Sequence, residues 1–295
     1  MCEILIRPDR RDYFLFIPGT HQSLENKAGK LSIVIPAYNE ENTILSILDR
    51  INQVRLINEI VKEVIVVNDC SRDKTDRLIK EYMADTPEMY IQYILHTVNQ
   101  GKGAAIHTGI AHVTGDYLII QDADLEYDPR EYNTLLKPIV EGHADVVFGT
   151  RFFGGKPHRI LFFWHPIGNR LLTFFSNIFT GLNLTDMETC YKLFRADILK
   201  GLRLTEKRFG FEPEITAKTA RIPGVRIYEV GISYYGRTFQ EGKKIGWKDR
   251  LRALYRIIKY KFIKNEYRPA KRPTGDGTYN LTTSERSTAP ESMDV

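Results

Sequence analysis

The chain has 295 residues, which is enough for one large domain or two small ones. Its 42% hydrophobic and 27% charged residues are ordinary for a folded protein, and a net charge of +5 lies far from the nucleic-acid-binding extreme, so no nucleic-acid partner is expected. The positive charge favours anionic ligands or an anionic surface. Three cysteines without paired spacing and a charged N-terminus without a signal-peptide core predict a cytoplasmic location.

In chain order, residues 1–30 form an irregular leader, and strands then alternate with helices. We predict strands at 31–36, 61–69, 90–95, 116–121 and 144–149, and helices at 40–51, 73–83 and 102–113. Near-continuous aliphatic strands between amphipathic helices indicate an α/β fold: a mostly parallel sheet with helices on both faces. We expect a single Rossmann-like domain over residues 31–265 and a disordered tail, rich in Thr, Ser and Pro, over 266–295.

The second half is less regular. It contains the aromatic-rich segment 160–180, the helix-like stretch EPEITAKTAR, the β-rich stretch VRIYEVGISYYGR, and a basic helix over 247–264. Polar residues interrupt segment 160–180, which therefore fails as a transmembrane span. Together with the basic helix it suits peripheral contact with an anionic membrane. The alternative is core packing, which we expect for Phe162, Phe163 and Phe174.

Polar residues follow three of the predicted strands: Asn39-Glu40, Asn68-Asp69 and Asp122-Ala123-Asp124. Ligands bind at the carboxyl ends of strands in sheets of this kind. If strand geometry continues past Gln121, then Asp122, Asp124 and Glu126 share one face and repel one another. Bound Mg²⁺ or Mn²⁺ would relieve that repulsion. The alternative is that acids gather near the turn at Asp128-Pro129.

Six motifs in the sequence resemble those of a known protein family. They are IVIPAYNEE, VIVVNDCSRDKT, NQGKGAAIHTGI, QDADLEYDP, FGTRF and YYGRTFQEGKKI, in this order across residues 31 to 260. The series resembles the family 2 glycosyltransferases, and within them the polyprenyl-phosphate sugar transferases of the dolichol-phosphate mannose synthase type. The resemblance implies a GT-A-like fold with a donor half, 31–150, and an acceptor half, 151–265. It also implies inverting, metal-dependent transfer from a GDP- or UDP-sugar to dolichyl or undecaprenyl phosphate.

The resemblance carries over to single residues on the donor side. The implied contacts to the sugar nucleotide are Pro36, Ala37, Tyr38, Glu40, Asp69, Lys102 and Asp122, and the implied metal ligands are Asp122, Asp124 and Glu126. Asp69 would contact the nucleoside, and the alternative is that Asn68-Asp69-Cys70-Ser71 caps a helix, with Ser71 as the cap. Lys102 would face the diphosphate, or would simply belong to a turn that starts a helix.

The implied catalytic residues are Asp124, Arg151, Asp186, Arg237 and Lys244. The last motif has one residue more before Gly242 than the family pattern, which leaves the register of Lys244 open, and plain surface charge is its alternative. We assign no chemical role to the acids of Glu212-Pro213-Glu214, because helix starts favour acids in any case.

The acceptor decides whether a catalytic base is needed. A phosphate monoester is already ionised, whereas a sugar hydroxyl needs a base, and Asp186 is the candidate for it. Transfer to a glycan or another hydroxyl therefore stays an alternative, as does a silent binding module. A pyrophosphorylase would be expected to carry a basic glycine-rich loop where this chain has PAYNEE. The membrane location and a homo-oligomeric state stay open.

Overall fold

The structure is a computed structural model that describes residues 29–153, 155–157, 159, 164–208, 210–237, 247–263 and 266–269, without the side chains of 164, 165 and 247–250. The predicted leader up to residue 28, most of the predicted tail, and Lys244 lie outside the described residues. The domain boundaries at 31 and 265 therefore stay a prediction.

One seven-stranded sheet runs through the domain, with strand order β3-β2-β1-β4-β6-β5-β7. β6 is antiparallel to both of its neighbours, β4 and β5, and the other pairs are parallel. The strands are β1 (Lys30–Ala37), β2 (Val61–Asn68), β3 (Ile91–Leu95), β4 (Tyr117–Ile120), β5 (Val146–Thr150), β6 (Lys192–Arg195) and β7 (Ile227–Gly231). The predicted mostly parallel sheet is confirmed.

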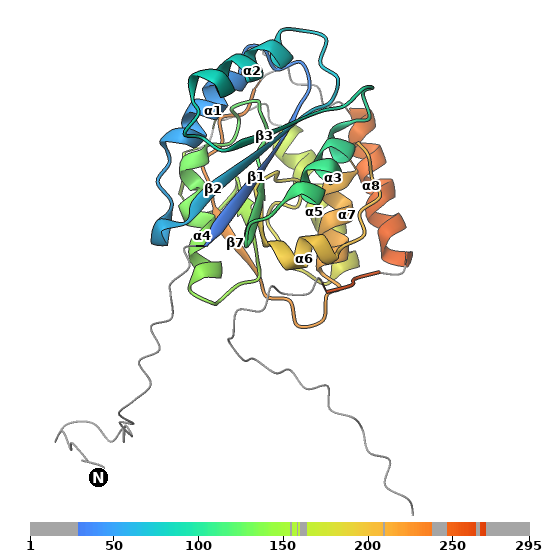
Figure 1. Cartoon of the computed structure of the whole chain (residues 1–295). Helices are drawn as coiled ribbons and strands as arrows, with labels where there is room; N and C mark the ends of the chain where they lie inside the picture. The colour runs from blue at the N-terminus through green and yellow to red at the C-terminus, as the bar shows by residue number, and fades with distance from the viewer. Residues whose placement is uncertain are drawn as a thin grey trace, which may run out of the picture.

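Helices cover both faces of this sheet. They are α1 (Ile44–Gln53), α2 (Thr75–Asp85), α3 (Lys102–His112), α4 (Tyr132–Val140), α5 (Trp164–Thr180), α6 (Ala196–Gly201), α7 (Phe211–Thr219) and α8 (Trp247–Phe262). In Figure 1, α1 and α4 lie to the left of the strands, α2 lies above them, and α3, α6, α7 and α8 lie to the right. Helices α5, α7 and α8 pack against one another. This confirms an α/β fold of one domain.

The core follows from the aliphatic strands. Ile33, Val64 and Ile119, at the centres of three neighbouring strands, are fully buried. Burial of each such side chain contributes about 1.5–3 kcal/mol before the cost of ordering the chain is counted. Strands that are apolar on both faces need helices on both sides, and for this reason the sequence pattern predicted the layers correctly.

Several boundaries differ from the expectation. α1 begins at Ile44 rather than at residue 40, because Glu40 to Thr43 form a turn in which the Thr43 hydroxyl donates to Glu40 Oε2 at 2.9 Å. α2 begins at Thr75, and Ser71 does not cap it: its hydroxyl instead accepts the N–H of Asn39 at 3.0 Å. β6 was not predicted, because its short sequence KLFR contains a lysine that the fold buries completely.

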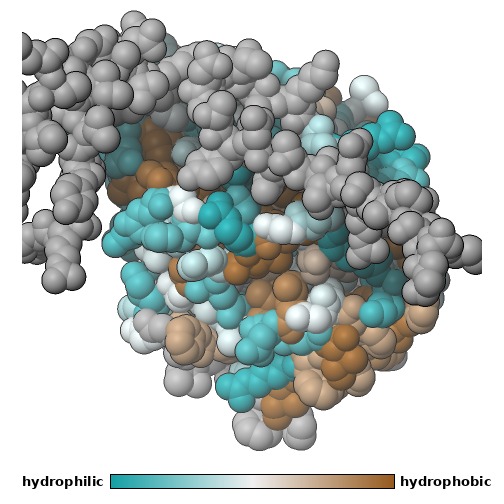
Figure 2. All heavy atoms as spheres, turned by 90° about the horizontal axis from the view of Figure 1, so that it is seen from below, coloured by the Kyte–Doolittle hydropathy of each residue, from teal (hydrophilic) through white to brown (hydrophobic). Residues whose placement is uncertain are grey.

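Helices α5 and α8 present an apolar outer face. Eight large side chains on them, between 40% and 81% exposed, recur at helical spacing: Ile167, Leu171, Phe174, Ile178, Leu251, Tyr255, Ile258 and Phe262. Figure 2 shows apolar side chains among hydrophilic ones toward the right, the side on which Figure 1 places α8. Core packing of Phe174 was wrong, since it is 58% exposed, and Phe162 and Phe163 lie outside the described residues. None of the helices within the described ranges has the length and apolar character to cross a membrane.

Candidate active site at the carboxyl ends of the strands

The acidic segment after β4 is a turn and not an extension of the strand. β4 ends at Ile120, and buried Gln121 anchors the turn, with its Oε1 accepting the hydroxyls of Tyr132 at 2.6 Å and Tyr191 at 2.5 Å. A turn follows at residues 123–124, and Leu125 has a φ of +63°, which is incompatible with an extended strand. The expectation that strand geometry carries the three carboxylates on one face is therefore wrong.

Each of the three carboxylates has a partner instead. Lys102 Nζ lies 2.6 Å from Asp122 Oδ1, and Arg237 Nη2 donates to Asp124 Oδ2 at 2.8 Å. Glu126 accepts the Arg237 N–H at 2.9 Å and the Tyr234 hydroxyl at 2.7 Å. Among the residues that the structure describes, no group of three or more His, Cys, Asp or Glu side chains is placed to hold a metal ion.

Negative charge nevertheless stays in excess here. Burial, and then the charges of Asp122 and Glu126, raise the pKa of Asp124 to about 7, although Arg237 opposes the shift. Carboxylates that crowd in this way suit a hard divalent cation. The oxygens of Asp124 already accept from Arg237 and from the Glu126 N–H, and those of Glu126 accept from Tyr234 and Arg237, so an ion would have to share or replace these contacts. The metal-binding role of all three stays a prediction.

Asp69 holds the loop that carries Lys102. It is 2% exposed, and its two carboxylate oxygens accept the N–H groups of Gln100 at 2.9 Å and Gly101 at 2.7 Å. His96 Nδ1 lies 2.7 Å from the same carboxylate. The alternative of a helix cap is therefore wrong for Asp69. Both of its oxygens already have partners inside the protein. Its expected contact with a nucleoside stays a prediction.

Glycine is required in this loop. Gly101 has a φ of +99°, which side-chain-bearing residues rarely adopt, and a Cβ on Gly103 would lie 2.2 Å from the carbonyl oxygen of Glu206. Lys102 is thereby fixed between two backbone constraints at the first residue of α3. The loop after β1 lies at the same edge of the sheet, since Asp69 donates its N–H to Ala37 O at 2.8 Å.

Pro36 and Ala37 are the last two residues of β1, and Tyr38 and Glu40 follow in the loop after it. The Glu40 N–H donates to Thr75 Oγ1 at 2.8 Å, which ties this loop to the start of α2. Glu40 also faces Arg237, and together with Asp124 and Glu126 it raises the arginine's pKa against the effect of burial. The structure thus brings the donor-side residues of the sequence prediction to one edge of the sheet.

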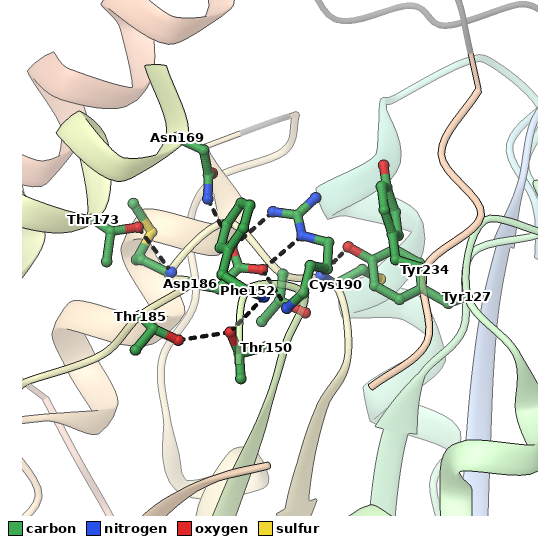
Figure 3. A network of polar contacts seen from close by, with 12 residues as sticks. Tyr127, Thr150, Phe152, Asn169, Thr173, Thr185, Asp186, Cys190 and Tyr234 are labelled. Atoms are coloured by element: carbon green, nitrogen blue, oxygen red, sulfur yellow. Dashed lines mark hydrogen bonds and ion pairs between the residues drawn. The ribbon is translucent and has the colours of Figure 1, made fainter. Parts of the chain in front are cut away.

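Arg151 and Asp186 form a buried pair in the predicted acceptor half. Arg151 Nε donates to Asp186 Oδ2 at 2.6 Å and Nη2 donates to Oδ1 at 2.7 Å, a two-pronged geometry. Figure 3 shows Asn169 pointing at the same carboxylate, to which its amide donates at 2.9 Å. Asp186 is fully buried. Burial alone would raise its pKa, but Arg151 and Asn169 outweigh burial and lower it.

Tyr234 joins the two sides of the site. Its hydroxyl donates to Glu126, while the guanidinium carbon of Arg151 lies 5.0 Å from the centre of its ring. In Figure 3 the ring of Tyr234 lies beside that of Tyr127, whose hydroxyl accepts the N–H of Cys190 at 3.1 Å. The acids after β4 and the Arg151–Asp186 pair are therefore parts of one contiguous site.

Sequence reasoning missed several polar residues here. Tyr234 and Asn169 were not singled out, and neither was the network in which buried Lys192 donates to Glu212 Oε2 and to the carbonyl oxygen of Met187 at 3.0 Å. Lys192 and Glu212 lie 20 residues apart, so no local motif reveals the pair. The one available signal was a lysine within an otherwise apolar strand, which needs a buried counter-charge.

Comparison with known proteins bears on this geometry. Residues 32–203 match the family described as "Glycosyl transferase family 2". An undecaprenyl-phosphate mannosyltransferase of Micrococcus luteus is 31% identical over 224 residues, which cover 72% of this chain and 86% of the relative. A dolichyl-phosphate beta-glucosyltransferase of Trichomonas vaginalis is 30% identical over 219 residues, or 69% of this chain. That alignment spans only 65% of the length of the Trichomonas protein.

Solved structures agree at the level of the fold. Glucosyl-3-phosphoglycerate synthase of Mycobacterium tuberculosis, crystallised with Mn²⁺, UDP and phosphoglyceric acid, superimposes with a TM-score of 0.59, with 80% of each chain covered and 20% identity. A second structure of that enzyme contains Mg²⁺ and UDP. Identity at this level supports the GT-A-like fold and no more. The family match over residues 32–203, the curated relatives and the fold agree, and this chain belongs to glycosyl transferase family 2.

Proposed function

We propose that this chain transfers a sugar, with inversion, from a nucleoside-diphosphate sugar to a polyprenyl phosphate, and that it uses Mg²⁺ or Mn²⁺. Membership of family 2 and the polyprenyl-phosphate acceptors in the names of two relatives support the reaction class. We choose a phosphate acceptor over a hydroxyl because Asp186, the candidate base, is fully buried and paired with Arg151.

On the donor side the residues at the strand ends would hold the sugar nucleotide. Bound Mg²⁺ or Mn²⁺, held by Asp122 and Asp124, would stabilise the charge that develops on the departing diphosphate. Lys102 and Arg237 already lie against these carboxylates, at 2.6 and 2.8 Å, and would supply positive charge beside the phosphates. Asp69 would act by holding the loop in which Lys102 is placed.

On the acceptor side a phosphate fits better than a hydroxyl. A phosphate monoester reaches the site ionised and attacks without a base. Asp186 would have to serve as that base for a hydroxyl, yet its lowered pKa makes it a weak one, and the fork of Arg151 occupies both of its oxygens. We therefore assign Asp186 the task of positioning Arg151, whose charge lies beside the reacting groups.

The outer face of α5 and α8 fits an acceptor that resides in a bilayer. Its apolar side chains are exposed at helical spacing, and basic residues flank them on both helices: Arg170, Arg252, Lys259 and Lys261. An apolar stripe bordered by cations suits shallow insertion among anionic headgroups. We propose that this face rests on the membrane surface, so that the acceptor phosphate reaches the site from the bilayer.

Product analysis tests the proposal. The protein is incubated with Mn²⁺, radiolabelled UDP-glucose or GDP-mannose, and either undecaprenyl phosphate or an oligosaccharide. We expect label in a lipid product that survives mild alkali and is hydrolysed by mild acid. Label that appears only in a new sugar–sugar linkage would refute a phosphate acceptor. Formation of a nucleoside-diphosphate sugar and pyrophosphate from a nucleoside triphosphate and a sugar 1-phosphate would refute a transferase.

A further inference from the structure

Two glutamates close to the site carry buried oxygens that bond to nothing in the protein. Oε1 of Glu188 and Oε1 of Glu212 are both shielded from solvent without a hydrogen-bond partner, and so is the hydroxyl of Thr189, a fully buried residue between Glu188 and Lys192. A buried polar atom without a partner costs the folded protein about 1–3 kcal/mol, and more when the group is charged. Such atoms are satisfied by ordered water or by a bound ligand.

The other oxygen of Glu212 has a firm partner. Glu212 lies in the first turn of α7, and its Oε2 accepts from Lys192, which is fully buried in β6. Lys192 also donates to the carbonyl oxygens of Met187 and Thr189. The Lys192 ammonium group therefore makes three hydrogen bonds within the protein, and one of them goes to Oε2 of Glu212. Oε1 of Glu212 is left without a hydrogen-bond partner.

The pair lies within electrostatic reach of the donor-side groups. Burial and then the charge of Glu212 raise the pKa of Glu188 to about 7. Burial raises the pKa of Glu212, Lys192 and then Lys102 oppose the rise, and Asp122 adds to it. The segment of Glu188 also packs against the start of the acidic turn, since Cys190, two residues further on, donates its Sγ–H to Ile120 O at 3.8 Å and its N–H to the Tyr127 hydroxyl at 3.1 Å. The two free oxygens therefore lie near Lys102 and Asp122, the groups that we assign to the diphosphate.

A purely structural role does not account for these oxygens. The same helix as Glu212 carries Glu214, which is fully buried and whose oxygens are all hydrogen-bonded. Its oxygens accept the N–H of Thr205 at 2.8 Å, the Thr205 hydroxyl at 2.7 Å and the N–H of Glu206 at 2.7 Å, while Lys218 lies 2.7 Å away. Glu214 shows what a structural glutamate looks like in this fold, and Glu188 and Glu212 differ from it.

We propose that Oε1 of Glu188 and Oε1 of Glu212 accept hydrogen bonds from hydroxyl groups of the transferred sugar, and that they select neutral, hydroxyl-rich hexoses and reject sugar acids. The inference rests on the proposed transferase function and names the sugar class of its donor. Hydroxyl donors would satisfy both carboxylates at once. A uronate would bring a third carboxylate against the pair, which like-charge repulsion disfavours.

Calorimetric titration at pH 8 with Mn²⁺ present, above the raised pKa of Glu188, tests this. Wild type, Glu188→Gln, Glu212→Gln and the matched control Glu214→Gln are titrated with UDP, GDP, UDP-glucose, GDP-mannose and UDP-glucuronate. Replacing a charged acceptor by a neutral one should weaken binding of the accepted nucleotide hexose about tenfold in the first two variants. Affinity for the nucleotide without sugar should stay within about twofold, and the preference for hexose over glucuronate should shrink. Glu214→Gln should unfold at a lower temperature and keep the wild-type preference.

The outcomes separate the two claims. Equal losses for the nucleotide and the nucleotide hexose in both variants, or an unchanged preference over glucuronate, would overturn the sugar contact while leaving the transferase in place. If wild type bound no nucleotide sugar at all, the proposed function itself would fail. Glu212→Gln removes a partner of Lys192, so its melting curve is recorded as well. Glu188→Gln leaves that ion pair intact and decides the question if Glu212→Gln does not fold.

Discussion

Glu188→Gln should stabilise the protein at alkaline pH and leave its stability unchanged at acidic pH. The ordinary pKa of a glutamate is 4.5, and burial beside Glu212 raises that of Glu188 to about 7. Glutamine has the shape of the protonated acid and cannot ionise. The substitution therefore fixes the form that the folded protein prefers.

The sign and size follow from proton linkage. Between pH 4.5 and 7 the unfolded chain has lost the Glu188 proton and the folded chain still holds it, so the free energy of unfolding of wild type falls as the pH rises. The loss is complete above pH 7 and amounts to about 3 kcal/mol, from 1.36 kcal/mol for each unit of pKa shift. The variant does not suffer this loss.

Urea unfolding at pH 4 and pH 8, without nucleotide or metal, checks the prediction. We expect nearly equal free energies of unfolding for wild type and Glu188→Gln at pH 4, below the ordinary pKa of the glutamate, and a variant more stable by about 3 kcal/mol at pH 8. Glu214→Gln is the control with the opposite sign. Lys218 and the Thr205 and Glu206 contacts lower the pKa of Glu214 against the effect of burial, so this variant should lose stability at pH 8. A Glu188→Gln variant no more stable than wild type at pH 8 would refute the reasoning.

Four further changes have expected outcomes. Asp124→Ala should abolish turnover and Mn²⁺-dependent nucleotide binding while circular dichroism stays native, and unchanged activity would remove Asp124 from the site. Asp186→Ala leaves the Arg151 charge buried without its partner and should lower the free energy of unfolding by about 3–5 kcal/mol, and a urea midpoint at the wild-type value would contradict this. Gly103→Ala drives a Cβ into Glu206 O, so nucleotide affinity should fall in calorimetry, and wild-type affinity would show that the loop need not be held this closely. Phe174→Glu should reduce co-sedimentation with vesicles of phosphatidylcholine and phosphatidylglycerol without changing nucleotide affinity, whereas undiminished binding would relocate the membrane contact.

The strands of the first half and the helices α1, α2 and α3 could be predicted because their signals are local, whereas α4 (Tyr132–Val140) was not predicted. Ile33 and Val64 belong to aliphatic runs, and each run is followed by an amphipathic stretch. β6 could not be predicted in the same way, because the burial of Lys192 depends on Glu212, which only the fold brings near. Local pattern is sufficient where neighbours in sequence are neighbours in space.

The sequence predicted which residues belong to the site better than it predicted how they contact one another. The resemblance named Arg151 and Asp186 separately, yet their ion pair joins residues 35 positions apart and follows from the fold alone. The prediction that the three carboxylates share one face was wrong because β4 ends at Ile120 and Leu125 has a positive φ, which a leucine in the sequence does not indicate. Residues i, i+2 and i+4 share a face only within a strand.

The bridging phenol of Tyr234 bears on how such enzymes can be recombined. It comes from the chain after β7, yet its contacts reach back to Glu126 and Arg151. A hybrid that fuses the first 150 residues of this chain to the remainder of a homologue would break this bridge unless the homologue supplied an equivalent tyrosine. Exchange of donor specificity by swapping halves therefore requires that position to travel with the first half.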